Sequence, residues 1–168
     1  MKILASGSTS RLYKKLVVEK KLASSAGGWF YGDGYDSGKL SVYAVANDGV
    51  GLEAVEAETD ALIAEIAAGG VTEAELKRAK NSLTAQFIYG LDSQATMARR
   101  YGWAAVVGQS VADVDSWPDD ITKVTAEQVT DAAAKQLDLR QSVTGYLIPQ
   151  ALPSAANKTD GATSPTNG

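Results

Sequence analysis

Histidine and cysteine are both absent from this 168-residue chain, which limits the chemistry that its side chains can perform. Without imidazole or thiolate ligands, the chain cannot supply an H-x-x-E-H zinc site or a cysteine zinc site. A carboxylate-only site would suit calcium or magnesium, yet no Asp/Asn-rich loop has the EF-hand spacing. We therefore expect no metal site within this chain.

Acidic pairs are the remaining candidates for acid–base chemistry, and they occur at Asp119-Asp120, at Asp113 with Asp115, and at Glu53 with Glu56. Each pair falls on an expected solvated helix face or at a helix start, where acidic side chains favour the positive end of the helix dipole. Helix capping and solubility are therefore preferred over catalysis. Ser8 and Ser24-Ser25 are available nucleophiles, but the chain has no histidine base, and spacing alone does not define a Ser/Lys pair.

The clearest helix start in the chain is Gly7-Ser8-Thr9-Ser10-Arg11-Leu12-Tyr13. Ser8 or Thr9 can cap the N–H groups that a helix start leaves unpaired. Leu12 and Leu16 lie four residues apart on one face, while lysine and glutamate residues occupy the other. This pattern predicts an amphipathic helix that runs to about Leu22.

The rest of the chain alternates between strand and helix patterns. Residues 23–31 and 39–46 predict two strands joined by a Gly/Asp-rich turn, and together an antiparallel hairpin. Five further helical patterns follow. One begins after Asn47 or Asp48, and two begin at the capping boxes 72–75 and 125–128. The other two begin after the break at 90–93 and after Gly108. Pro118 is expected to end the helix that begins after Gly108. A last strand is expected at Gln141–Ile148. Six helices and three strands predict an α+β fold, in which an antiparallel sheet has helices packed on one face.

The aromatic residues of the hairpin, Trp29, Phe30, Tyr31, Tyr35 and Tyr43, allow two interpretations. Core and cross-strand packing is the preferred one. The alternative is a wall that contacts a peptide.

Composition excludes several classes of protein. Sixteen basic and twenty acidic residues give a net charge of −4, and no basic cluster of the kind that binds nucleic acid is present. The lysines at 14–15 and 20–21 follow helical spacing, which indicates a solvated helix face. No run of about 18 apolar residues predicts a membrane segment, and the N-terminus lacks a signal-peptide pattern. Residues 150–168 are rich in Ser, Thr, Asn, Gly and Pro, and we expect a disordered tail there.

Several pieces of the sequence, in this order, resemble the C-terminal, non-catalytic half-domain of pitrilysin-type zinc peptidases, the M16 family, and most closely its short bacterial branch. The resemblance covers residues 6–149. Its pieces are Gly7–Tyr13, Leu16–Ala23, Thr72–Lys80, Asp92–Gln94, Trp117-Pro118, Val124–Val129 and Ser142–Pro149. Family half-domains carry further strands and a helix upstream of the glycine-containing loop. We therefore expect residues 1–149 to be an M16 half-domain that is incomplete at its N-terminus; a complete small α+β domain is the alternative.

The resemblance implies a role in proteolysis. The chain would scaffold and enclose a peptide substrate, while zinc is held by a partner, either a catalytic N-terminal half-domain or a second M16 subunit. Alternatives are a structural subunit without peptidase activity, similar to respiratory-complex core proteins, and a standalone peptide-binding module. In the absence of a zinc ligand set, we expect this chain to be inactive by itself. The periplasm of a Gram-negative bacterium is the compartment that the resemblance favours.

The resemblance also assigns roles to particular positions. The family's second half carries an arginine and a tyrosine, seven residues apart, that hold the substrate backbone near the zinc. Their positions fall here on Val17 and Ser24, which cannot do so because valine has no donor and serine is too short. Gly7, Ser8 and Arg11, in and after the glycine-containing loop, are the candidate substrate-binding residues, although a structural role at the helix start is preferred for Arg11.

Overall fold

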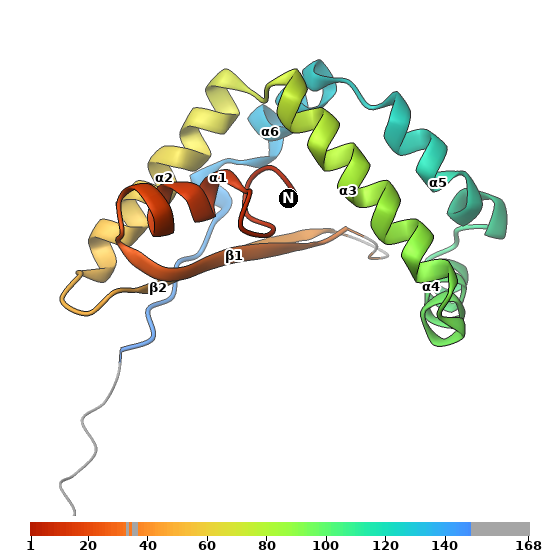
Figure 1. Cartoon of the computed structure of the whole chain (residues 1–168), viewed down its shortest axis with the longest axis horizontal. Helices are drawn as coiled ribbons and strands as arrows, with labels where there is room; N and C mark the ends of the chain where they lie inside the picture. Colours follow the sequence, from red (N-terminus) through yellow and green to blue (C-terminus); the bar gives the residue numbers. More distant parts are fainter. Residues whose placement is uncertain (33, 35–36, 149–168) are drawn as a thin grey trace, which may run out of the picture.

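The computed structural model describes residues 1–32, 34 and 37–148, and Figure 1 shows their path. The elements of this part of the chain, in order, are α1 (Arg11–Tyr13), the π-helix η1 (Lys14–Glu19), β1 (Ala23–Tyr31), β2 (Lys39–Ala46), α2 (Leu52–Gly69), α3 (Glu73–Leu91), α4 (Gln94–Val106), α5 (Val111–Lys123), α6 (Ala126–Gln136) and the 3₁₀ turn η2 (Leu139–Gln141). Six α-helices and one antiparallel sheet in these residues confirm the expected α+β class. The tail expected at 150–168 lies outside the described residues.

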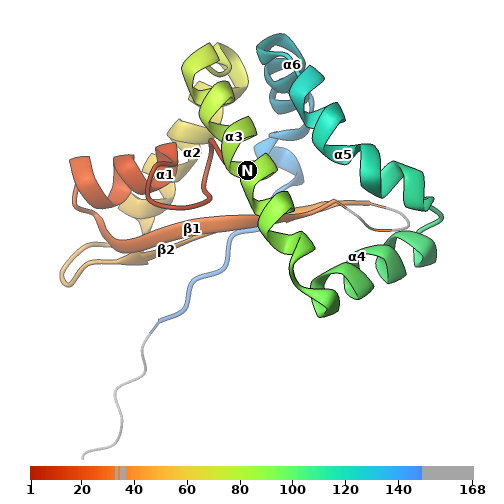
Figure 2. The same ribbon diagram turned by 45° about the vertical axis from the view of Figure 1, so that its right-hand side comes forward.

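The two strands form the predicted antiparallel hairpin. Ala26 pairs with Ala44, Gly28 with Val42, and Phe30 with Leu40, and a bulge lies between Ala23 and Ser25. The helices lie on one side of this hairpin, and its opposite face is open (Figures 1 and 2).

The third predicted strand is wrong. Residues 139–141 form η2, and residues 142–148 have neither helical nor strand structure. A strand needs a neighbouring edge for its backbone hydrogen bonds, and no backbone hydrogen bond joins residues 142–148 to β1 or β2 in the described part of the chain. Tyr146 instead donates a hydrogen bond to Glu56 on α2, and this bond raises the pKa of Tyr146 to about 12.

The opening helix starts slightly later than predicted. Ser10, rather than Ser8 or Thr9, is its N-cap: its Oγ accepts from the Tyr13 N–H at 3.4 Å and donates to the Gly7 carbonyl at 2.7 Å. After Tyr13 the α-helix widens into the π-helix η1, which ends at Glu19 rather than at about Leu22 as predicted. Its apolar face is nevertheless correct, because Leu12 and Leu16 are fully buried.

The capping boxes predicted at 72–75 and 125–128 are both present, and a third, not predicted, occupies 110–113. The expected cap of α2 is wrong, because Gly51 occupies that position. Asn47 instead donates a side-chain hydrogen bond at 2.7 Å to the carbonyl of Lys21, whose φ of 53° marks a tight turn.

Pro118 does not end α5 but lies inside it. The capped first turn of α5 and its contacts with α3 and α4 stabilise the helix by more than the loss of one backbone hydrogen bond at Pro118 destabilises it.

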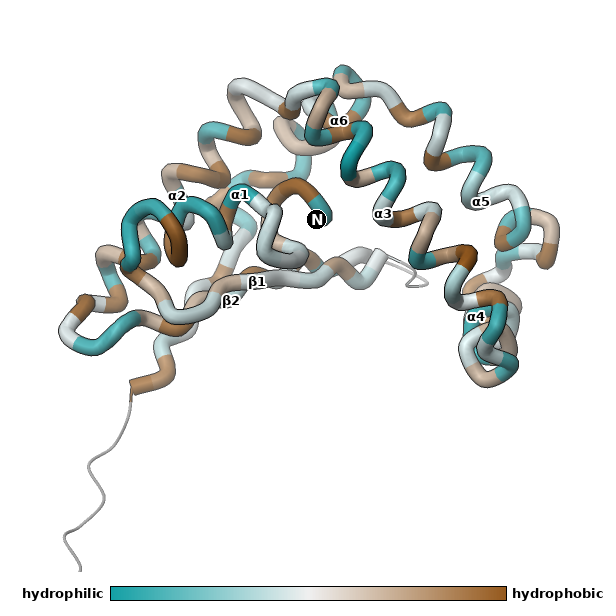
Figure 3. Tube along the Cα trace, viewed as in Figure 1, coloured by the Kyte–Doolittle hydropathy of each residue, from teal (hydrophilic) through white to brown (hydrophobic). Residues whose placement is uncertain are grey.

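The main core lies between α1, η1, α2 and the helix-facing side of the hairpin. Figure 3 shows that these neighbouring elements all contain apolar residues. The helix α6 returns to pack on α2. The buried residues of this core are Leu4, Ala5, Leu12, Leu16, Ala23, Ala26, Val55, Leu62, Ile63 and Ile66.

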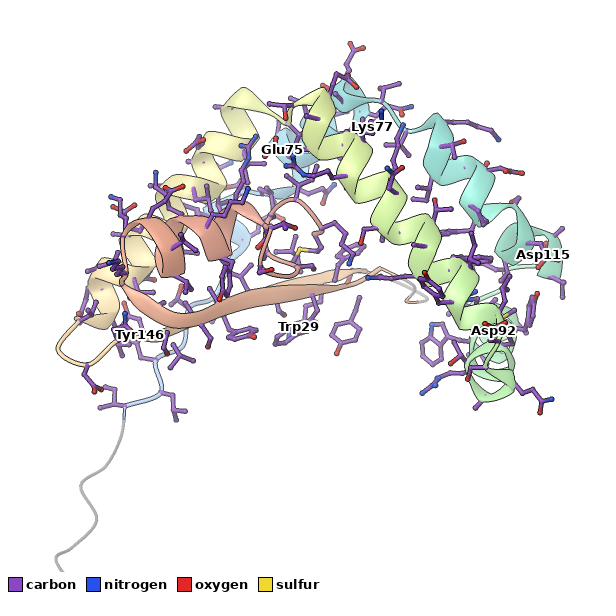
Figure 4. All side chains as sticks on the ribbon, in the orientation of Figure 1. Trp29, Glu75, Lys77, Asp92, Asp115 and Tyr146 are labelled. Atoms are coloured by element: carbon purple, nitrogen blue, oxygen red, sulfur yellow. The ribbon has the colours of Figure 1, made fainter. Side chains whose placement is uncertain are left out.

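The hairpin aromatics do not belong to this core, which overturns the preferred interpretation in part. Trp29, Phe30, Tyr31 and Tyr43 are 44, 58, 66 and 47% exposed, and Tyr35 lies outside the described residues. Trp29 projects from the open face of the hairpin, away from the helices (Figure 4). Cross-strand packing is present, because the Trp29 and Tyr43 rings lie 5.9 Å apart. The Tyr43 ring also covers Gly27, where a Cβ would approach it to 2.9 Å.

Candidate functional site

The loop before α1 is shaped by its own hydroxyl groups and by one glycine. Gly7 has a φ of 86°, a conformation that glycine adopts without strain. Ser10, which is fully buried, closes the turn through its bond to the Gly7 carbonyl. Ser6 donates to the Gly28 carbonyl at 3.2 Å and so attaches the loop to β1. Both ends of the exposed segment 7–9 are therefore held by the fold.

Arg11 joins this loop to the start of α3. Its Nε and Nη2 each donate to one carboxylate oxygen of Glu75 at 2.8 Å, and its Nη1 lies 3.8 Å from Glu65. Glu75 Oε2 also accepts from the backbone N–H and the hydroxyl of Thr72, both at 2.9 Å. The Arg11 hydrogen bonds are the main reason that the pKa of Glu75 falls to about 2, and the same pair raises the pKa of Arg11.

Beside this pair lies a cleft of about 230 Å³, which we call the Gly7 cleft. One wall is formed by residues at the N-terminus and in the loop, and the other by one face of α3. The lining residues are Lys2, Ile3, Ser6, Gly7, Ser8, Thr9, Glu75, Arg78, Ala79 and Ser82.

The predicted site residues divide between the cleft and its support. Gly7 and Ser8 line the Gly7 cleft, whereas the Arg11 guanidinium is occupied by Glu75. The family's arginine and tyrosine positions lie elsewhere. Val17 packs partly buried against the main core, and exposed Ser24 donates to the Val45 carbonyl at 3.3 Å. Of the predicted positions, only Gly7 and Ser8 therefore line the Gly7 cleft, and Val17 and Ser24 lie outside it.

At least one member of each acidic pair has a structural partner. Asp113 belongs to the capping box of α5, and Asp115 accepts a hydrogen bond from Tyr101 at 2.7 Å. Asp120 pairs with Lys123 at 2.8 Å. Glu56 accepts the hydrogen bond of Tyr146, which lowers the pKa of Glu56. The bonds of Asp113, Asp120 and Glu56 favour their ionised forms, so these groups are poor proton donors at neutral pH.

The side chains of the described residues do not fit a zinc ion. Among the described residues, no group of three or more His, Cys, Asp or Glu side chains is placed to hold a metal. In the same residues, no helix combines the length and the apolar character that crossing a bilayer requires.

Sequence reasoning missed the α3 wall of the cleft. Glu75, Arg78, Ala79 and Ser82 are spaced at three and four residues and so share one helix face. This spacing was a usable signal for one face of α3. Nothing in the sequence showed that this face would lie opposite Lys2 and the loop.

Sequence comparisons relate this chain to known proteins. The family described as peptidase M16 inactive domain has a sequence model that matches residues 1–83. A protein of Mycobacterium leprae (strain TN), named as an uncharacterized zinc protease, is 32% identical over 138 residues. That alignment covers 82% of this chain and 30% of the M. leprae protein.

Solved structures show the same fold. The inactive peptidase domain of a Bordetella parapertussis protein superposes with a TM-score of 0.80 at 22% identity, covering 92% of this chain and 81% of that one. A protease from Helicobacter pylori has a TM-score of 0.67 at 26% identity, covering 80% of this chain and 32% of its own. This chain belongs to the peptidase M16 inactive-domain family. It spans about a third of the length of the M. leprae and H. pylori proteins.

Proposed function

We propose that this chain is the non-catalytic half of an M16-type zinc-dependent peptidase. In this role it scaffolds the enzyme and encloses the peptide substrate, while a catalytic N-terminal half-domain, or a second M16 subunit, supplies the zinc site. The water-activating chemistry then belongs to the partner. The residues of this chain hold and orient the peptide.

One observation carries this proposal. The segment that matches the inactive-domain family, residues 1–83, contains both walls of the Gly7 cleft, residues 2–9 and 75–82. The part of the chain that defines the family is thus also the part that builds its loop-bordered cleft. In the proposed role, Gly7 and Ser8 contact the peptide, and Arg11 holds the loop against α3 through Glu75.

The surroundings of Val17 and Ser24 favour a second candidate, a structural subunit without peptidase activity. Val17 is committed to core packing and Ser24 to a bond within the hairpin, so neither position offers the long donor that the resemblance assigns to the family's arginine and tyrosine. The two functions predict different results in a reconstitution.

The test mixes this chain with the H-x-x-E-H half-domain of an active M16 peptidase whose own C-terminal half has been deleted. Cleavage of a quenched fluorescent peptide is followed with and without a zinc chelator. We expect no cleavage by this chain alone and chelator-sensitive cleavage by the mixture. Assembly of the two halves without cleavage would support the structural subunit. Cleavage by this chain alone would contradict both functions.

Two glycine variants test the role of the loop. Gly7→Ala and Gly49→Ala both place a Cβ at a positive φ, 86° and 78°, and in both the Cβ meets no atom within 4 Å. They therefore carry a similar backbone strain of about 1 kcal/mol, but only Gly7 lines the cleft. We expect Gly7→Ala to slow cleavage by the mixture and Gly49→Ala to leave it unchanged. Equal rates for the two variants would remove the loop from the proposal.

A further inference from the structure

The Gly7 cleft has an excess of positive charge. Two of its lining side chains, Lys2 and Arg78, are cations, and neither forms an ion pair within the described residues. The only carboxylate of the lining, Glu75, is already bound by Arg11 through two hydrogen bonds. Lys2 and Arg78 therefore remain available for an anion from outside the chain.

Hydrogen-bond donors also predominate on the loop side of the cleft. The backbone N–H groups of Gly7, Ser8 and Thr9 make no hydrogen bond to other described residues. The Gly7 carbonyl, by contrast, already accepts bonds from Ser10. Consecutive free N–H groups and hydroxyls beside two cations suit an acceptor that carries negative charge.

The size and lining of the cleft limit the kind of anion. A volume of about 230 Å³ and only two cations fit one small anionic group rather than a polyanion. Ile3 and Ala79 give the cleft an apolar part, which suits the aliphatic stem of a side chain or the last residue of a peptide. The net charge of −4 on the whole chain argues against a nucleic acid as the ligand.

We propose that the Gly7 cleft binds a single carboxylate of a peptide through Lys2, Arg78 and the loop N–H groups. This inference rests on the proposed peptide-enclosing function and names the substrate class that the cleft selects. The carboxylate comes either from an Asp or Glu side chain or from the C-terminus of the peptide. A carboxylate held here would fix one end of the substrate relative to the catalytic half.

The test uses the complete chain and three labelled peptides of the same length. One has a central Glu and an amidated C-terminus, one a central Gln and a free C-terminus, and one a central Gln and an amidated C-terminus. Fluorescence anisotropy at low ionic strength measures the affinity of each. We expect at least one of the two carboxylate peptides to bind about tenfold more tightly than the neutral peptide, a difference of about 1.4 kcal/mol. Which of the two binds more tightly identifies the source of the carboxylate.

Charge variants locate the binding. Arg78→Gln, combined with Lys2→Gln, is expected to abolish the preference for the carboxylate peptides. Lys77→Gln is the matched control, because Lys77 is the preceding residue of α3 and is exposed but does not line the cleft. In NMR spectra, the amide signals of Gly7, Ser8 and Thr9 are expected to shift when the preferred peptide is added.

Each other outcome has a definite meaning. Equal binding of all three peptides, or a preference that survives in the Lys2/Arg78 double variant, overturns the carboxylate inference. The peptide-enclosing function would then still be judged by the reconstitution with the catalytic half. Absence of binding by every peptide also overturns the carboxylate inference. Loss of cleavage in the reconstituted pair is the separate result that counts against the proposed function.

Discussion

Two regions of this chain are stabilised in different ways. We call the first the core region, which consists of residues 1–70 and α6, and the second the arm, which consists of α3, α4 and α5. The core region holds the cluster of ten buried apolar residues. In the arm, only Leu76, Ala104 and Val114 are buried among the described residues. The arm extends beyond the tip of the hairpin (Figure 2).

The arm depends more on individual contacts between its helices. Phe87 stacks on Trp117 with ring centroids 5.6 Å apart, and the Arg100 guanidinium lies 4.1 Å from the centroid of the Phe87 ring. Most of the exposed apolar side chains outside the hairpin and residues 139–148 also lie in the arm, among them Ile88, Trp103 and Val106. The family match ends at residue 83, within α3, so the region with the larger core is also the one that identifies the family.

Leu12→Ala in the core region should cause the largest loss of stability, larger than the matching change in the arm. Leu12 is 0% exposed in the core region, so truncation leaves a cavity that its neighbours cannot fill, and we expect a loss of about 3 kcal/mol in the free energy of unfolding. Leu76→Ala in the arm removes the same atoms at 5% exposure. Because Leu76 also borders an open surface depression, its site can relax, and we expect a smaller loss. Urea denaturation measures both; equal losses would contradict the comparison.

Gly70→Ala should destabilise the core region at the end of α2, where the chain leaves for the arm. Gly70 follows α2 with φ 67° and ψ −152°, and a Cβ there would lie 2.2 Å from the Thr130 hydroxyl of α6. Backbone strain and this clash together should cost about 2 kcal/mol. The control is Gly69→Ala, which is helical and meets no atom within 4 Å, and which should stabilise the protein. Thermal unfolding would show shifts of opposite sign; a neutral Gly70→Ala would contradict the expected strain.

Glu75→Gln should cost less than Leu12→Ala or Gly70→Ala, about 1.5 kcal/mol at neutral pH, because it removes one charged hydrogen-bonded pair. Glutamine still supports the capping box, so the change isolates the Arg11 interaction. The folded-state pKa of Glu75, about 2, lies below its ordinary value of 4.5. The stabilisation is therefore complete above pH 4.5 and is lost as the pH falls towards 2.

The measurement for this variant is unfolding by urea at a series of pH values. The parent chain should lose more stability between pH 4.5 and pH 2 than Glu75→Gln does. Glu73→Gln removes a charge from the same helix turn without touching Arg11 and should behave like the parent chain. Parallel pH profiles for the parent and Glu75→Gln would show that the pair contributes nothing to stability.

Local patterns predicted much of the fold. Alternation and turn residues identified the hairpin, and Thr-x-x-Glu and Thr-x-x-Gln identified two helix starts, because each of these signals acts within a few residues. The errors occurred where distant parts of the chain decide. Residues 142–148 were expected to belong to a strand, but whether they pair depends on a neighbouring edge. Asn47 is a good capping residue, but in the fold it bonds to Lys21 instead.

The candidate site was predictable on one side only. Gly7 and Ser8 were predicted as substrate-binding residues from the resemblance to the M16 half-domain, and the glycine and hydroxyls before the helix located the loop in the sequence. The opposite wall comes from α3, and the Arg11–Glu75 bond joins residues that are 64 positions apart. The three-residue spacing of Glu75 and Arg78 places them on one helix face, but nothing in the sequence indicates that this face meets Lys2.

Glu75 also suggests an order of assembly during folding. Its bond to Thr72 closes a loop of only three residues, so the entropic cost of forming it is small. Its bond to Arg11 closes a loop of 64 residues, so the entropic cost of forming it is larger. The first turn of α3 can therefore form early, with one carboxylate already oriented, and α1 docks onto it later. Late docking would make the loop at Gly7 one of the last parts of the molecule to become ordered.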